Sequence, residues 1–283
     1  MKMSRQPWRW LFVLLFGALG ATAAHASGPS DLLVAPTRVV FEGRLRTAEI
    51  TLVNIGSSTA TYRISFVHLR MSEEGGTKEI ETAGAEPGER FADELIRYSP
   101  RQVTLEPNVA QTVRIQVRKP EDLAPGEYRS HLLFRAVPSA GRDAKTAEDA
   151  TAFSVKLTAI YGVSIPVIVR QGDTSAKATL SDLEIVPPSG AEAMPALRFR
   201  ISRTGNQSIY GNLRVTFVPA GGKASVVGLA NGVAVYTPNP VRRAVIPLHV
   251  PPGVVLKNGR LHLAYTKQDK GNETIAEADR LVP

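Results

Sequence analysis

The stretch FSVKLTAIYGVSIPVIVR, residues 153–170, alternates between two kinds of residue along its whole length. All nine odd-numbered positions are apolar: Phe153, Val155, Leu157, Ala159, Tyr161, Val163, Ile165, Val167 and Val169. The even-numbered positions are mostly small, polar or charged. This period of two predicts a β-strand with one buried face. A strand of this length would span about 60 Å, whereas an ordinary strand has about 5–6 residues.

Two interpretations of this strand remain open on the sequence pattern alone. In the first, all nine odd-numbered side chains belong to the core of one domain. In the second, the strand lies partly at an edge, and its first apolar side chains, Phe153, Val155, Leu157 and Ala159, enter a groove of a partner protein by strand addition. Pro166 lacks a backbone N–H, which is compatible with an edge strand or a bulge. An uncovered apolar edge would favour aggregation, so we expect another segment or protein to cover the edge of this strand.

The first 26 residues read as a secretory signal peptide. Lys2, Arg5 and Arg9 precede an apolar run, and Ala24-His25-Ala26 has the form of a cleavage site. The apolar run is shorter than the roughly 20 residues of a membrane span, so we expect no membrane insertion after cleavage. Cleavage would leave 257 residues, enough for two domains of ordinary size.

Composition excludes several classes of function. The sequence contains no cysteine, which excludes structural disulfides and thiol chemistry. Its net charge of +8 falls to +5 without the signal peptide, and the basic residues are scattered, so we predict no nucleic-acid partner. The four histidines outside the signal peptide are isolated and lack the spacing of a metal site. No nucleophile motif or phosphate-binding glycine loop occurs, and we predict no enzyme, no metal and no cofactor.

Short alternating segments separated by turn residues fill the rest of the chain. Residues 27–171 are expected to form an immunoglobulin-like sandwich whose first strand is interrupted at Pro36 and whose polar, glycine-rich residues 75–91 form a surface loop. LAPGEY, residues 123–128, has the form of a tyrosine corner ending at Tyr128. Residues 170–177 read as a linker, and residues 172–283 as a second, smaller β-sandwich. The predicted class is therefore all-β with two sandwich domains.

Several segments in this order resemble the periplasmic pilus-assembly chaperones of the chaperone–usher pathway. The resemblance rests on LLVAPTRVVFEG, AEITLVN, YSPRQVTLEPNVAQTVRIQV, EYRSHLLFRAVP and KLTAIYGVSIPVIVR, and it covers nearly the whole mature chain. It implies two immunoglobulin-like domains in an L-shaped arrangement. It also implies a periplasmic protein that lends its long strand to incomplete pilus (fimbrial) subunits and passes them to an outer-membrane usher.

The resemblance further implies two basic residues that anchor the C-terminal carboxylate of the subunit. Arg38 in the first strand matches one of them. The second is a lysine in the long strand of typical members, but here Pro166 or a close neighbour stands at that position. Arg101 is predicted to substitute from an adjacent strand, with Arg170 as a weaker candidate, and this departure suggests an atypical or archaic branch.

Two other classes of protein compete with this interpretation. A secreted pilin or adhesin-like subunit should carry an N-terminal donor extension, but only residues 27–31 separate the predicted cleavage site from the first strand. An enzyme or sugar-binding sandwich would reveal itself by a thermal shift with small ligands. Self-association of the free protein, covering its own strand edge, is a further expectation.

Overall fold

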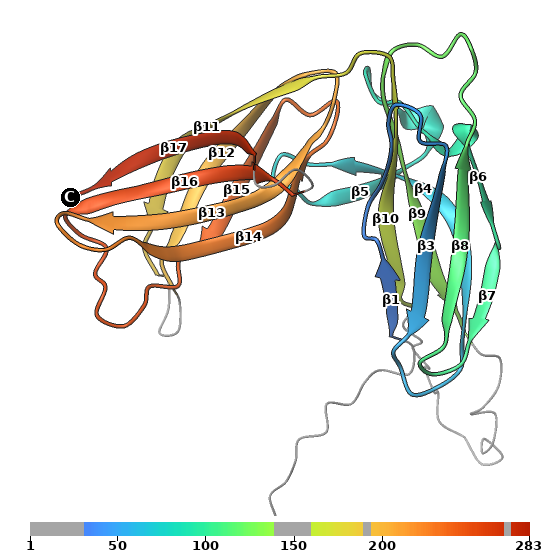
Figure 1. Cartoon of the computed structure of the whole chain (residues 1–283), viewed down its shortest axis with the longest axis horizontal. Coiled ribbons are helices and arrows are strands. Elements are labelled where there is room, and N and C mark those ends of the chain that lie inside the picture. Colours follow the sequence, from blue (N-terminus) through green and yellow to red (C-terminus); the bar gives the residue numbers. More distant parts are fainter. Residues whose placement is uncertain (1–30, 139–159, 189–193, 269–272) are drawn as a thin grey trace, which may run out of the picture.

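The computed structural model describes residues 31–138, 160–188, 194–268 and 273–283. They form two β-sandwiches set at a large angle to each other, which gives the molecule an L-shaped outline (Figure 1). We call them the N-terminal sandwich, β1 to β10, and the C-terminal sandwich, β11 to β17. The predicted all-β class and L-shaped arrangement are confirmed. No helix in the described ranges is long and apolar enough to cross a membrane.

The N-terminal sandwich consists of two facing sheets. The first has the order β1 (Leu32–Ala35), β3 (Thr47–Asn54), β8 (Ala110–Val117) and β6 (Ile96–Ser99). The second has the order β2 (Val39–Phe41), β10 (Gly162–Gln171), β9 (Gly126–Val137), β4 (Ala60–Met71) and β5 (Thr77–Ile80), with β7 (Gln102–Leu105) also on β4. Alternate residues meet between the sheets, and Ile50, Leu52, Val113 and Phe134 are completely buried there. Two short 3₁₀ turns, Thr82–Gly84 and Asp93–Leu95, lie in the connections.

Two local predictions for this sandwich are confirmed. The chain switches sheets at Pro36, so that β1 belongs to one sheet and β2 to the other. The hydroxyl of Tyr128 donates a hydrogen bond of 2.9 Å to the carbonyl of Ala124, as a tyrosine corner requires. Both features support the immunoglobulin-like assignment.

The predicted surface loop at residues 75–91 is wrong in part, because Thr77–Ile80 form β5. This strand pairs with the far end of β4, from His68 to Met71. Its side chains are exposed or half-buried, so no apolar alternation marked it in the sequence. Gly75, with φ at +85°, permits the turn between the two strands.

The C-terminal sandwich has a three-stranded and a four-stranded sheet. The first has the order β11 (Ala176–Val186), β12 (Ala196–Gly205) and β15 (Val241–Pro247). The second has the order β14 (Ser225–Val235), β13 (Ile209–Pro219), β16 (Gly259–Lys267) and β17 (Thr274–Val282). Its core is separate from that of the first sandwich. Residues 172–175 connect β10 to β11, inside the predicted linker, while the boundary between residues 171 and 172 stays a prediction.

Direct contacts hold the two sandwiches together. Met71 and Ile168 of the N-terminal sandwich pack with Ala234 and Tyr236 of the C-terminal sandwich. The tip of the β4–β5 hairpin also reaches β15, where the backbone N–H of Arg243 donates to the carbonyl of Glu73 at 2.6 Å. The angle between the sandwiches is therefore set by apolar packing and by hydrogen bonds.

Candidate functional site

β10 divides into a covered part and an uncovered part. On one side, the whole strand pairs with β9. On the other side, β2 pairs with it in parallel, but only over Val167–Val169. The edge of residues 162–166 therefore has no strand partner within the described ranges. A row of unpaired backbone groups of this kind is a template for another strand.

The burial of the alternating side chains changes at the same place. Ile165, Val167 and Val169 are at most 2% exposed and belong to the core. Val163 and Tyr161, which continue the same alternation, are 37% and 66% exposed. The interpretation in which all nine odd-numbered side chains lie in the core is therefore wrong for these two. Phe153, Val155, Leu157 and Ala159 lie outside the described residues, so their groove-filling role stays a prediction.

Arg38 stands where β2 begins, at the junction between the sandwiches. Its guanidinium carbon lies 4.5 Å from the ring centroid of Tyr210 and 5.7 Å from that of Tyr236, both in the C-terminal sandwich. Its Nη2 is 3.5 Å from the Ser208 hydroxyl, a long hydrogen bond. Its Nη1 is buried and has no hydrogen-bond partner among the described residues. One face of this guanidinium stacks on aromatic rings while part of its donor capacity is unused.

A second guanidinium, that of Arg129 on β9, lies beside the Tyr236 ring. Arg129 is opposite Ile168 of β10, and its guanidinium carbon is 4.2 Å from the ring centroid of Tyr236. The residue is only 9% exposed, and its Nε and Nη1 have no hydrogen-bond partner in the part of the chain that the structure describes. Burial lowers the pKa of this guanidinium from its usual value, and the positive charge of Arg38 contributes to the shift.

His131 lies beside Arg129 on the same face of β9. It is 5% exposed and meets the Tyr236 ring edge-on, with centroids 6.2 Å apart. Burial and, second, the positive charge of Arg129 lower the pKa of His131 to about 3, so its imidazole is neutral at pH 7. Its Nδ1 also has no partner among the described residues. We call Arg38 and Arg129 the cationic junction, beside which the neutral His131 packs.

A separate network neutralises the buried acid of this region. The Glu127 carboxylate accepts hydrogen bonds from Arg170 Nε and from the backbone N–H of Ser208, both at 3.1 Å. Arg170 Nη1 bonds Glu42 at 2.7 Å. Arg170, the weaker anchor candidate, is therefore already occupied by two carboxylates. Because Glu42 and Glu127 both pair with Arg170, the cationic junction has no ion pair among the described residues.

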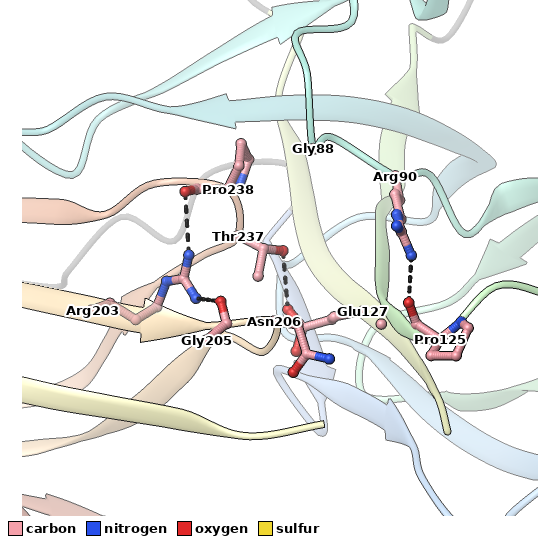
Figure 2. Close-up of a pocket in the computed structure, with 10 residues that line it drawn as sticks. Gly88, Arg90, Pro125, Glu127, Arg203, Gly205, Asn206, Thr237 and Pro238 are labelled. Carbon is pink, nitrogen blue, oxygen red and sulfur yellow. Dashed lines mark hydrogen bonds between the residues drawn. The ribbon is translucent and has the colours of Figure 1, made fainter. Parts of the chain in front are cut away.

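A pocket of about 240 Å³ lies beside Glu127, between the sandwiches (Figure 2). Figure 2 shows Arg203 pointing to the carbonyls of Pro238 and Gly205, and Thr237 pointing to Glu127. Arg203 donates to four carbonyl oxygens in all. Since these polar groups satisfy one another, we read this pocket as part of the domain junction rather than as a ligand site.

Arg101 does not lie near the cationic junction, contrary to the prediction that it supplies the second anchor. It precedes β7, which pairs with β4, whereas Arg38 precedes β2 at the opposite edge of the sheet. With β10, β9 and β4 between them, the two edges are about 19 Å apart at about 4.8 Å per strand. The Arg101 guanidinium stacks on Tyr98 at 3.8 Å. The residue whose guanidinium lies on the Tyr236 ring together with that of Arg38 is Arg129.

The sequence contains one signal for Arg129, which was not among the predicted site residues. In EYRSHLLFRAV, Arg129 and His131 share one face of a strand whose other face is apolar except at Ser130. Such a pair usually marks a solvated face. Only the approach of Tyr236 turns it into a buried one.

A serine, a histidine and an aspartate also meet on this sheet, but without the geometry of a catalytic triad. Ser130 Oγ is 3.3 Å from His68 Nδ1 and 3.1 Å from Asp93 Oδ1. It is completely buried and accepts the backbone N–H of Ala92 at 2.9 Å. A hydroxyl held in this way pins the connection before β6 to β9 and is not available as a nucleophile.

The chain matches no family model and no curated protein, but it is similar to solved structures of fimbrial chaperones over nearly its whole length. The YadV chaperone is 11% identical, with a TM-score of 0.45, over 88% of this chain and 98% of its own. The CupB2 chaperone of Pseudomonas aeruginosa is 12% identical, with a TM-score of 0.41, over 88% and 100%.

A third similar structure contains a complex. It is the CsuC–CsuE chaperone–tip adhesion subunit pre-assembly complex from the archaic chaperone-usher Csu pili of Acinetobacter baumannii. The matched chain is 10% identical, with a TM-score of 0.42, over 90% of this chain and all of its own length.

Proposed function

We propose that this protein is a periplasmic chaperone that holds incomplete pilus subunits by donor-strand complementation and passes them to an outer-membrane usher. The observation that carries the proposal is the position of Arg38 on the edge of β10. The edge is free along residues 162–166 and is occupied by β2 from Val167 onward. Arg38, which directly precedes β2, stands at the point where the free edge ends.

A strand added to the free edge in parallel would run end to end with β2. Its direction would be that of β10, toward the junction of the sandwiches, and its C-terminal carboxylate would arrive at Arg38. Arg129, opposite Ile168, lies on β9, on the far side of β10 from β2, and is level with Val40, two residues beyond Arg38. The two guanidiniums offer unused N–H donors, and guanidinium–carboxylate hydrogen bonds are among the strongest in proteins.

The apolar side chains of β10 supply the second half of the mechanism. Tyr161 and Val163 protrude beside the added strand, on the face that continues into the core through Ile165. A sandwich that lacks one strand exposes a groove that such alternating side chains fill. Phe153, Val155, Leu157 and Ala159 would extend the same row. No chemical step is required, because binding covers the exposed groove of the partner until another strand replaces β10.

The first test is capture of the partner from the periplasm. Tagged wild-type protein is expressed in its own host, isolated gently and analysed by mass spectrometry, beside Arg38→Ala, Arg129→Ala and the control Arg214→Ala. Arg214 is an exposed arginine on the C-terminal sandwich. We expect a small secreted β-rich subunit at about one to one with wild type and control, and its loss with either junction variant.

A peptide experiment then isolates the carboxylate. The last residues of the captured subunit are synthesised with a free C-terminus and with a C-terminal amide. We expect the acid to bind wild-type protein at least tenfold more tightly, and the preference to vanish in Arg38→Ala. Equal binding of acid and amide would refute the anchor. Absence of any co-purified subunit while subunits are expressed would refute the chaperone function.

A further inference from the structure

The C-terminal sandwich is closed along one side and partly open along the other. On the closed side, β17 reaches β11, where Arg280 Nη1 donates to the carbonyl of Leu183 at 2.6 Å. On the other side, the N–H of His249, just after β15, donates to the carbonyl of Val227 of β14 at 2.6 Å, and at the opposite end of the two strands the Arg242 side chain bonds the carbonyl of Ala234. The approach is closest at Gly228, where a Cβ would lie 2.9 Å from Ile246 Cγ2.

Between these two contacts, a pocket of about 470 Å³ opens toward the core. Its floor consists of Leu213, Val233 and Ile246, which are 0%, 9% and 1% exposed. Val245, 58% exposed, stands among the residues that line it. The volume falls within the range of about 300–1,000 Å³ that is usual for small-molecule sites, and such sites are mostly apolar with few polar groups.

The polar part of the lining is dominated by three arginines, of which two are neutralised. Arg198 pairs with Glu184 at 3.2 Å, and Arg243 pairs with Glu73 at 3.1 Å. Arg242 has no carboxylate partner among the described residues. Its Nη1 donates to the carbonyl of Ala234 at 2.6 Å, while its Nε is buried without a partner. The pocket thus combines an apolar interior with one guanidinium that has no carboxylate partner among the described residues, while Glu74, the acid in the lining, lies 3.8 Å from Arg243.

We propose that this pocket binds an amphipathic carboxylate, that is, a small molecule with an apolar chain and one carboxylate group. The chain would lie on Leu213, Val233 and Ile246, and the carboxylate would pair with Arg242. The match is one of charge and polarity, because an apolar floor excludes a purely polar anion and an unpaired guanidinium favours an anionic head group. This site is distinct from the cationic junction and does not depend on the proposed chaperone function.

The experiment uses the mature protein without any partner and decanoate as the probe. Binding is measured by isothermal titration calorimetry, beside decanol, which has the same chain without the charge. Chemical shifts of the methyl groups of Leu213, Val233 and Ile246 locate the ligand in wild-type protein. We expect one site, shifts at these methyl groups, and at least tenfold weaker binding of decanol.

Two variants and a control test the geometry. Ala230→Trp fills the pocket and is expected to abolish binding of both ligands, because Ala230 lines it. Arg242→Leu is expected to weaken decanoate at least tenfold and to leave decanol unchanged, while Arg214→Leu, outside the pocket, changes neither. Decanoate binding that survives Ala230→Trp, or that shifts methyl groups elsewhere, would overturn the proposal, as would absence of binding to folded wild-type protein. If Arg242→Leu does not fold, the methyl shifts of wild-type protein and the effect of Ala230→Trp decide whether decanoate binds in this pocket.

Discussion

The backbone N–H of Ser208, in the C-terminal sandwich, donates a hydrogen bond of 3.1 Å to the carboxylate of Glu127, in the N-terminal sandwich. The Glu127 side chain is completely buried, and the same carboxylate pairs with Arg170 at 3.1 Å. One acid therefore ties the end of β10 to the residue that precedes β13 in the other sandwich. A buried charge of this kind is tolerated only while its partners remain.

Replacing Glu127 with glutamine is expected to destabilise the protein. Arg170 is then left with the exposed Glu42 as its one carboxylate partner among the described residues, so the free energy of unfolding should fall, by up to about 3 kcal/mol, as for other buried pairs that lose one partner. Urea unfolding measures the change. Glu49→Gln is the control, because the Glu49–Arg114 pair is exposed at 62% and 82% and should contribute less than about 1 kcal/mol. Equal effects of the two variants would contradict the role given to Glu127.

Arg129→Met is expected to separate stability from function. In the free protein, two nitrogens of the Arg129 guanidinium are buried without partners, which costs about 1–3 kcal/mol. An apolar side chain of similar length removes this cost, so the free energy of unfolding should stay equal or rise. Binding of the subunit acid peptide should nevertheless fall at least tenfold. Urea unfolding and calorimetry on one preparation check both, and a destabilised variant would show that the guanidinium is satisfied in solution.

Stability should depend on pH through His131. Its folded pKa of about 3 lies below the usual histidine pKa of 6.5, so the unfolded chain binds a proton that the folded protein does not. Stability contributed by this group is complete above pH 6.5 and is lost as the pH falls toward 3, by about 1.4 kcal/mol per pH unit. Between pH 7 and pH 5, His131→Leu should lose about 2 kcal/mol less than wild type. Urea unfolding at these two pH values tests this, and identical losses would refute it.

The two halves of β10 should respond differently to a negative charge. Val163→Asp places the carboxylate on a side chain that is 37% exposed, so the fold should tolerate it, while binding of the subunit should fall at least tenfold. Ile165→Asp buries the carboxylate at a position that is 2% exposed and should unfold the N-terminal sandwich. Circular dichroism and the capture experiment distinguish the two outcomes. Full capture by Val163→Asp would exclude the exposed row from the binding surface.

Local patterns in the sequence were sufficient for the class of fold. The alternation in residues 153–170 predicted the strand seen at Gly162–Gln171, Pro36 marked the change of sheet, and Tyr128 marked the corner. Each of these signals depends on neighbours close in the chain. β5 was missed because none of its four side chains is fully buried, so nothing in its sequence alternates.

The candidate site, by contrast, depended on contacts between distant parts of the chain. Resemblance led to Arg38, but also to Arg101, which the strand order places at the opposite edge of the sheet. Arg129 could not be recognised from the sequence, because its burial requires β9 to lie beside β10 and Tyr236 to cover it from the other sandwich. The sequence by itself determined which residues alternate and where strands are interrupted. Only the tertiary structure decided which charged side chains are buried away from water without gaining an ion-pair partner. The reason is that desolvation depends on every surface that packs around a group.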